Sequence, residues 1–175
     1  MDFKLKLGEE EEGLTEANII GYADADWGGD TKDRKSTSGQ CFKVHGGTIS
    51  WSSIKQDCVR LSSKEAKYIS LSEACQELIW LRNLLKDFHV AFEKNVMYED
   101  NQSCLTSLSS EKFSSKSKHI EVRYHFAKDL KQKNLVNFQY CPSENMIADM
   151  LTKPLESVKL RKLTQLIGLG DFKMS

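Results

Sequence analysis

The segment Tyr22-Ala23-Asp24-Ala25-Asp26-Trp27 places two carboxylates in a stretch that otherwise has the pattern of a strand. Residues 19–27 alternate with period two, so that Tyr22, Asp24 and Asp26 share one face. Carboxylates among apolar residues are costly to desolvate, and metal ions are among the few partners that offset this cost. The segment therefore indicates a strand that carries one part of a metal site.

Three further acids stand in equally distinctive segments. Glu65 lies in Ser62-Ser63-Lys64-Glu65-Ala66 at the start of a helix, Asp100 directly follows an apolar strand, and Asp149 lies in Ala148-Asp149-Met150-Leu151-Thr152-Lys153-Pro154. A lone acid of this kind is more often a helix cap or a surface charge. Four together favour a shared two-metal nuclease site over four separate surface roles.

The residues alone leave one choice open. Asp26 competes with Asp24, because residues two apart on a strand point the same way about 7 Å apart. By the same alternation Glu99 points away from Asp100, and this favours Asp100 as a ligand.

Periodicity and cap signals predict an ordered series of strands and helices. Gly46-Gly47 predicts a two-residue hairpin. The strands are expected at 19–27, 39–45, 48–53, 96–99 and 135–140, and the helices at 62–88, 101–108, 119–131, 144–154 and 158–167. This order is typical of an α/β protein with antiparallel strands at its beginning.

Composition limits the remaining possibilities. The chain has 175 residues, with 25 Lys plus Arg against 25 Asp plus Glu, so any attraction to nucleic acid must be local, as in the basic stretch 112–133. The five cysteines are scattered singly, and their spacing signals neither a disulfide framework nor a zinc site. With no apolar run of membrane length, we expect a cytoplasmic or nuclear protein.

Several strings of the sequence, in their order and spacing, resemble the ribonuclease H domain of copia-type (LTR) retrotransposon Pol polyproteins over roughly residues 1–169. They are Tyr22-Ala-Asp-Ala-Asp-Trp27, Asp33-Arg-Lys-Ser-Thr-Ser-Gly39, Ile49-Ser-Trp51, Ser62-Ser-Lys-Glu-Ala66, Ile79-Trp-Leu-Arg82, Glu99-Asp-Asn-Gln-Ser103, Lys118-His-Ile120, Arg123-Tyr-His-Phe126 and Ala148-Asp-Met-Leu-Thr-Lys-Pro-Leu155. The resemblance implies the ribonuclease H-like fold, a mixed five-stranded sheet with helices on both faces.

The resemblance also implies a domain organisation. Residues 1–18 would be a truncated connection to an upstream reverse transcriptase, 19–155 the ribonuclease H domain, and 156–175 a C-terminal amphipathic tail. In the full element the domain would act inside a virus-like particle. The chain would then be a fragment of a polyprotein.

The family's metal-binding acids fall on Asp24, Glu65, Asp100 and Asp149. They would hold two Mg²⁺ ions, for which Mn²⁺ can substitute, and hydrolyse the RNA strand of RNA/DNA hybrids. Through the Tyr-x-Asp pattern the resemblance selects Asp24 over Asp26. The stretch 140–146 before Asp149 contains no histidine, so we assign no general base, and we expect His119 and His125 to have structural roles.

A ribonuclease H distinguishes RNA from DNA by 2′-hydroxyls and hybrid shape, with cations and hydroxyls on the phosphates. Simple exposure to solvent of a basic loop and of the start of the following helix explains Lys116 and Lys118 equally well. The candidate substrate contacts are Arg34, Ser36, Thr37, Asn101, Gln102, Lys116 and Lys118.

The sequence departs from the family pattern beside the second acid. The usual Thr-Glu-Ala-Glu is here Lys64-Glu65-Ala66-Lys67, and Arg60 stands at a position that is usually small. The added positive charge either strengthens phosphate binding or reflects drift in a decaying copy of the element. The alternative to an active enzyme is therefore an inactive or co-opted remnant that acts as a nucleic-acid-binding or interaction module.

Overall fold

A computed structural model describes residues 16–57, 59, 62–110 and 118–169 of the chain. The strands are β1 (Glu16–Asp26), β2 (Thr37–Val44), β3 (Gly47–Lys55), β4 (Ala91–Glu99) and β5 (Asn137–Tyr140). The helices are α1 (Ser63–Asp87), α2 (Gln102–Ser109), α3 (Lys118–Gln132), the 3₁₀ helix η1 (Ile147–Leu151) and α4 (Ser157–Ile167).

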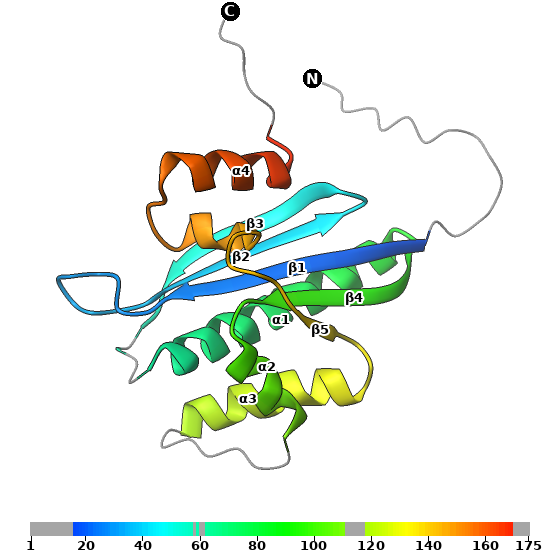
Figure 1. The fold of residues 1–175 in the computed structure, drawn as a ribbon. Helices are drawn as coiled ribbons and strands as arrows, with labels where there is room; N and C mark the ends of the chain where they lie inside the picture. The colour runs from blue at the N-terminus through cyan, green and yellow to red at the C-terminus, as the bar shows by residue number, and fades with distance from the viewer. Residues whose placement is uncertain (1–15, 58, 60–61, 111–117, 170–175) are drawn as a thin grey trace, which may run out of the picture.

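The five strands form one mixed sheet in the order β3-β2-β1-β4-β5. β1, β2 and β3 pair antiparallel, whereas β4 runs parallel to both β1 and β5. Figure 1 shows α1, α2 and α3 on one face of this sheet and η1 and α4 on the other. The predicted fold class is confirmed.

The core lies mainly between the sheet and α1. Ile19 on β1, Phe42 on β2 and Met97 on β4 are fully buried against Leu71 and Leu78 of α1. α1 begins as predicted, because the Ser62 side chain accepts a hydrogen bond from the Glu65 amide and so caps the helix. The rotation of this long helix against the sheet determines which of its side chains reach the end of β1.

The β2–β3 hairpin turns one residue earlier than the glycine pair suggests. Val44 pairs with Gly47, so the two turn residues are His45 and Gly46. Both have positive φ, at 49° and 79°, as a type I′ turn requires. Gly47 instead begins β3.

The helix predicted over 144–154 is much shorter in the structure. Only the five residues of η1 are helical, and the amides of Asp149 and Thr152 each bond to the carbonyl three residues earlier. η1 packs directly on β2 at Gly39, where an added Cβ would lie 2.6 Å from the Ala148 carbonyl oxygen. Gly39 pairs with Asp24 in the sheet, so this close contact brings Asp149 toward the end of β1.

The C-terminal helix packs on the same sheet as the rest of the domain. Leu163 of α4 is fully buried with Cys41 and Ile147, and the Thr48 hydroxyl donates a hydrogen bond to the Ile167 carbonyl at 2.7 Å. Residues 1–15 and 170–175, which belong to the predicted linker and tail, lie outside the described residues. No helix within the described ranges is both long and apolar enough to cross a membrane.

We expect Gly39→Ala to lower the free energy of unfolding by about 1–3 kcal/mol, because its methyl group would overlap η1 and force it away from β2. Urea unfolding followed by circular dichroism measures this loss. Gly47→Ala is the matched control, since its added Cβ would come no closer than 3.6 Å to the Val44 carbonyl oxygen. Equal stabilities of the two variants would show that η1 does not depend on the missing side chain.

Candidate functional site

Three of the four predicted acids converge at the end of the two central parallel strands. Asp24 lies near the end of β1, Asp100 directly follows β4, and Asp149 lies on η1. The Thr152 hydroxyl oxygen lies 3.0 Å from both an Asp24 carboxylate oxygen and the Asp149 carbonyl, and so connects two of the acids. Burial raises the pKa of Asp24, and the charges of Asp100 and Asp149 raise it further.

Lys67, which is not among the predicted site residues, lies among these acids. Lys67 of α1 contacts Asp24 Oδ1 at 2.5 Å through its Nζ atom, and it also donates a hydrogen bond to Asp100 Oδ1. Its side chain is only 13% exposed, and that of Asp24 is 2% exposed. Although burial alone would lower the pKa of Lys67, Asp24, Asp100 and Glu99 raise it, so the ammonium form is retained.

The helical repeat explains why α1 presents this lysine. Lys67 is four residues before Leu71 and seven before Ala74, both fully buried, so it lies on the face of α1 that packs against the sheet. Residues two apart on a helix point about 200° apart around the axis. α1 therefore presents Lys67 to Asp24 and Asp100, while Glu65 projects from a different side of the helix and its role as the second acid stays a prediction.

Glu99, which strand alternation disfavoured as a ligand, also lies beside Lys67. Glu99 is fully buried, and its carboxyl group lies 3.8 Å from Lys67 Nζ, which also contacts Asp100, so strand alternation does not keep the two acids apart. One carboxyl oxygen accepts a hydrogen bond from the Asn101 amide at 3.0 Å. Burial raises the pKa of Glu99 well above its ordinary value.

Asp149 is held by two lysines of its own. Lys153 Nζ lies 2.7 Å from Asp149 Oδ1, and Lys159 of α4 donates a hydrogen bond to Oδ2. Burial opposes ionisation of this carboxyl, but the two ammonium groups outweigh it and lower its pKa. The run of lysines after the fourth acid is the only sequence signal for this arrangement.

Asp100 is also engaged on both oxygens. Besides the contact from Lys67, Asp100 Oδ2 accepts a hydrogen bond from the Ser143 hydroxyl at 2.8 Å. Burial opposes ionisation here too, but the bond and charge of Lys67 lower the pKa of Asp100. Asp26, the rival to Asp24, lies over the loop after β1, since a Cβ on Gly29 would meet its carboxylate at 1.7 Å.

These residues do not fit the two Mg²⁺ ions that the family resemblance implies. Magnesium ligands must offer free oxygen lone pairs, whereas Asp24, Asp100 and Asp149 each contact a lysine ammonium. In the part of the chain that the structure describes, no group of three or more His, Cys, Asp or Glu side chains is arranged to hold a metal ion. The three acids instead surround the ammonium groups of Lys67 and Lys159.

The candidate substrate residues differ in how buried they are and in what they contact. Arg34 is exposed in the loop after β1 with a φ of 57°, while Thr37 begins β2 and is half-buried. Ser36 is fully buried, and its hydroxyl accepts a hydrogen bond from the Gly28 amide at 3.2 Å. Ser36 is therefore a structural residue of the loop.

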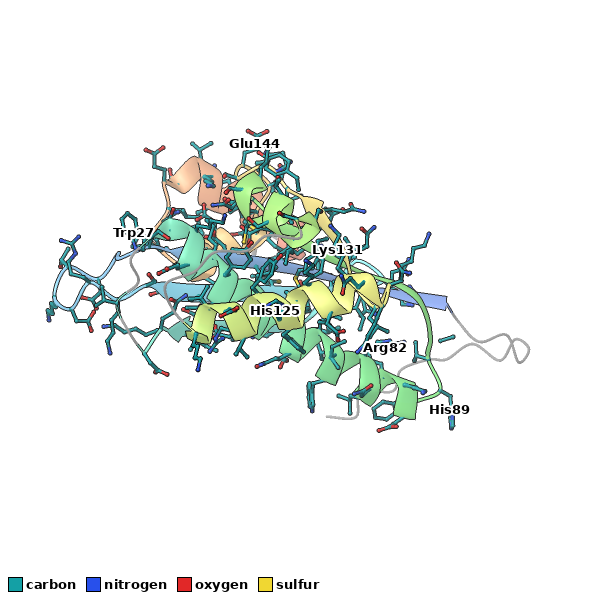
Figure 2. The ribbon with its side chains drawn as sticks, turned by 90° about the horizontal axis from the view of Figure 1, so that it is seen from below. Trp27, Arg82, His89, His125, Lys131 and Glu144 are labelled. Carbon is teal, nitrogen blue, oxygen red and sulfur yellow. The ribbon has the colours of Figure 1, made fainter. Side chains whose placement is uncertain are left out.

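The second group of candidates surrounds the start of α2 and α3. Asn101 caps α2 by accepting a hydrogen bond from the Cys104 amide at 3.0 Å. Gln102 and Lys118 are exposed, whereas Lys116 lies outside the described residues. Figure 2 shows His125 on α3 and His89 at the end of α1 far from Trp27, which closely follows Asp24 in the chain.

We expect Lys67→Met to lower the free energy of unfolding near neutral pH by roughly 3 kcal/mol, because removing one partner of a buried ion pair leaves charge uncompensated. Chemical denaturation at fixed ionic strength measures the change. Lys55→Met is the control, since its ion pairs with Asp30 and Asp33 lie at the surface, with the lysine side chain 46% exposed. A loss no larger for Lys67→Met than for this control would mean that the buried pairs contribute little.

Known proteins resemble this chain in both sequence and fold, although no protein-family model matches it. The chain is 36% identical over 151 residues to the retrovirus-related Pol polyprotein from transposon TNT 1-94 of Nicotiana tabacum. It is 36% identical over 153 residues to that from transposon RE2 of Arabidopsis thaliana. These matches cover 86% and 87% of the chain but only 11% and 10% of the relatives, so the chain spans about a tenth of their length.

The structural comparison gives the fold. The crystal structure of LC11-RNase H1 in complex with RNA/DNA hybrid matches with a TM-score of 0.58 over 77% of this chain and 93% of that one. The sequences are 16% identical, so this likeness establishes the fold alone. The chain therefore belongs with the retrovirus-related Pol polyproteins of transposons, as a segment that has the ribonuclease H fold.

Proposed function

We propose that this chain is the ribonuclease H-type domain of a copia-type Pol polyprotein, and that it binds RNA/DNA hybrids without hydrolysing them through a pair of divalent ions. The observation that carries the proposal is the Lys67 ammonium between Asp24 and Asp100. The fold and the relatives support the ribonuclease H-type domain, and the lysine argues against metal-dependent cleavage.

Two-metal hydrolysis makes demands that the described arrangement does not meet. One ion activates a water molecule and the other stabilises the leaving oxygen, and both need carboxylate oxygens as ligands. Lys67 and Lys159 instead contact the oxygens of Asp24, Asp100 and Asp149. An ammonium group is a single positive charge without open coordination positions, so it neutralises the acids but cannot activate water as a metal ion does.

The same lysines favour binding of a polyanion without metal. Acids that lacked counterions would repel a phosphate backbone, whereas here each converged acid contacts a lysine. The exposed side chains of Arg34, Gln102 and Lys118 are available for phosphate and minor-groove contacts. A protein of the same fold has been crystallised with an RNA/DNA hybrid, which makes this duplex the first substrate to test.

Metal-dependent hydrolysis of the RNA strand is the second candidate function. The convergence of Asp24, Asp100 and Asp149 favours it, because these are three of the four positions that the family resemblance assigns to Mg²⁺ or Mn²⁺ ligands. In that alternative Lys67 would have to leave the site when an ion binds. A reverse transcriptase joined upstream, as in a Pol polyprotein, is the proposed partner in either case.

We expect the chain to bind a labelled RNA/DNA hybrid in EDTA and to leave it uncut in 10 mM Mg²⁺ or Mn²⁺, because the converged acids are already paired. Fluorescence anisotropy measures binding and gel electrophoresis measures cleavage, with an active ribonuclease H as positive control. Asp100→Asn is assayed alongside. Cleavage by the parent chain that Asp100→Asn abolishes would establish the enzyme, and absence of hybrid binding would refute the proposed function.

Replacing Lys118 by alanine should weaken hybrid binding several-fold. It should also reduce the slope of the logarithm of the binding constant against the logarithm of the salt concentration by about one, as expected when one phosphate contact is lost. Titrations at several salt concentrations give both quantities. Lys133→Ala is the matched control, because this exposed lysine follows the opposite end of α3 and pairs with Asp129. Identical salt slopes for both variants would place the duplex elsewhere.

A further inference from the structure

We infer that Lys67 is the built-in cation of the acid cluster, and that the side chain at position 67 alone determines whether Asp24 and Asp100 bind a divalent ion. The inference rests on the proposed function, which it deepens by naming the residue that excludes the metal. It concerns ion binding, and it can be tested without any nucleic acid.

The position of the Lys67 ammonium group excludes a shared ion. Lys67 Nζ lies 2.5 Å from Asp24 Oδ1 and also contacts Asp100 Oδ1, so it occupies the point between the two strand ends that a shared ion would need. Magnesium binds oxygen ligands at about 2.0–2.1 Å. A magnesium ion bound to these two oxygens would therefore overlap the Lys67 ammonium group, so only one of the two can occupy the site.

The charges of the converged acids are balanced by lysines of the same chain. Asp24, Asp100 and Asp149 supply three negative charges, and Lys67, Lys153 and Lys159 supply three positive ones. A divalent ion would therefore enter a site whose acids are already neutralised, and it would be repelled by Lys67 at close range.

The packing of α1 keeps the lysine in place. Its helix face is fixed by the fully buried Leu71, Ala74 and Leu78, and the side chain is only 13% exposed. If Lys67 moved into solvent, the buried carboxylate of Asp24 would lose its strongest counterion. Occupation of the site by Lys67 therefore contributes to the stability of the domain.

Reversing the charge at position 67 should open the site. In Lys67→Glu three carboxylates would face one another on β1, α1 and the end of β4, and their repulsion would be relieved by a divalent ion with oxygen ligands. Removing the positive charge alone, in Lys67→Gln, should have the same effect in weaker form. Lys86→Glu makes the same charge change at an exposed position near the end of α1.

The experiment measures Mn²⁺ binding by electron paramagnetic resonance and thermal unfolding with and without Mn²⁺, using the full chain and these three variants after metal removal by EDTA and gel filtration. We expect the parent chain and Lys86→Glu to bind no Mn²⁺ below millimolar concentration and to keep their melting temperatures. Lys67→Glu should bind at least tenfold more tightly than the parent and melt several degrees higher with Mn²⁺.

Two results would overturn the inference. The first is Mn²⁺ binding by the parent chain that Asp24→Asn abolishes. The second is unchanged affinity in a folded Lys67→Glu variant. If Lys67→Glu does not fold, Lys67→Gln decides, because it must still bind Mn²⁺ more tightly than the parent. Either failure leaves the hybrid-binding proposal standing, since that proposal depends on anisotropy and cleavage with the parent chain alone.

Discussion

The ammonium group of Lys67 connects the three elements on which the site depends. It joins α1 to the end of β1 through Asp24 and to the end of β4 through Asp100, and it lies near the buried Glu99. Carboxylates so poorly exposed to water require a counterion, and here the chain supplies it from a neighbouring helix. The acids at the sheet end are therefore compatible with a stable fold in the absence of metal.

The opposite face of the sheet repeats this solution at Asp149. η1 approaches β2 closely at Gly39, Thr152 connects Asp149 to Asp24, and lysines from the following loop and from α4 contact the carboxylate. α4 thus takes part in the site as well as covering the sheet. The whole arrangement has the ribonuclease H topology, but its charges are balanced within the chain.

This balance explains how the ribonuclease H fold and the metal chemistry can separate. The fold depends on the sheet order and on the apolar face of α1, and the side chain of Lys67 is not part of that apolar core. We propose that binding of a divalent ion depends on the sign of the charge at that position. A single side chain can therefore alter the proposed activity while the relationship to transposon Pol polyproteins remains recognisable.

Much of the molecule could be predicted from the sequence alone, because local patterns report local structure. Period-two alternation located β1, and the serine cap located the start of α1. The predictions of the hairpin turn and of the helix around Asp149 were less accurate. The turn depends on positive φ at His45, and η1 depends on close packing against Gly39.

The amino-acid sequence determined the order of the elements, the family resemblance and three acids of the cluster. Only the tertiary structure decided that Lys67 reaches that cluster, because this depends on how α1 is rotated against the sheet. The helical repeat that Lys67 shares with Leu71 and Ala74 hinted at this, but the partners of Lys67 lie 43 and 33 residues away in the chain. Ion pairs between segments so far apart leave no local pattern, and they form only when the strands and the helix have packed.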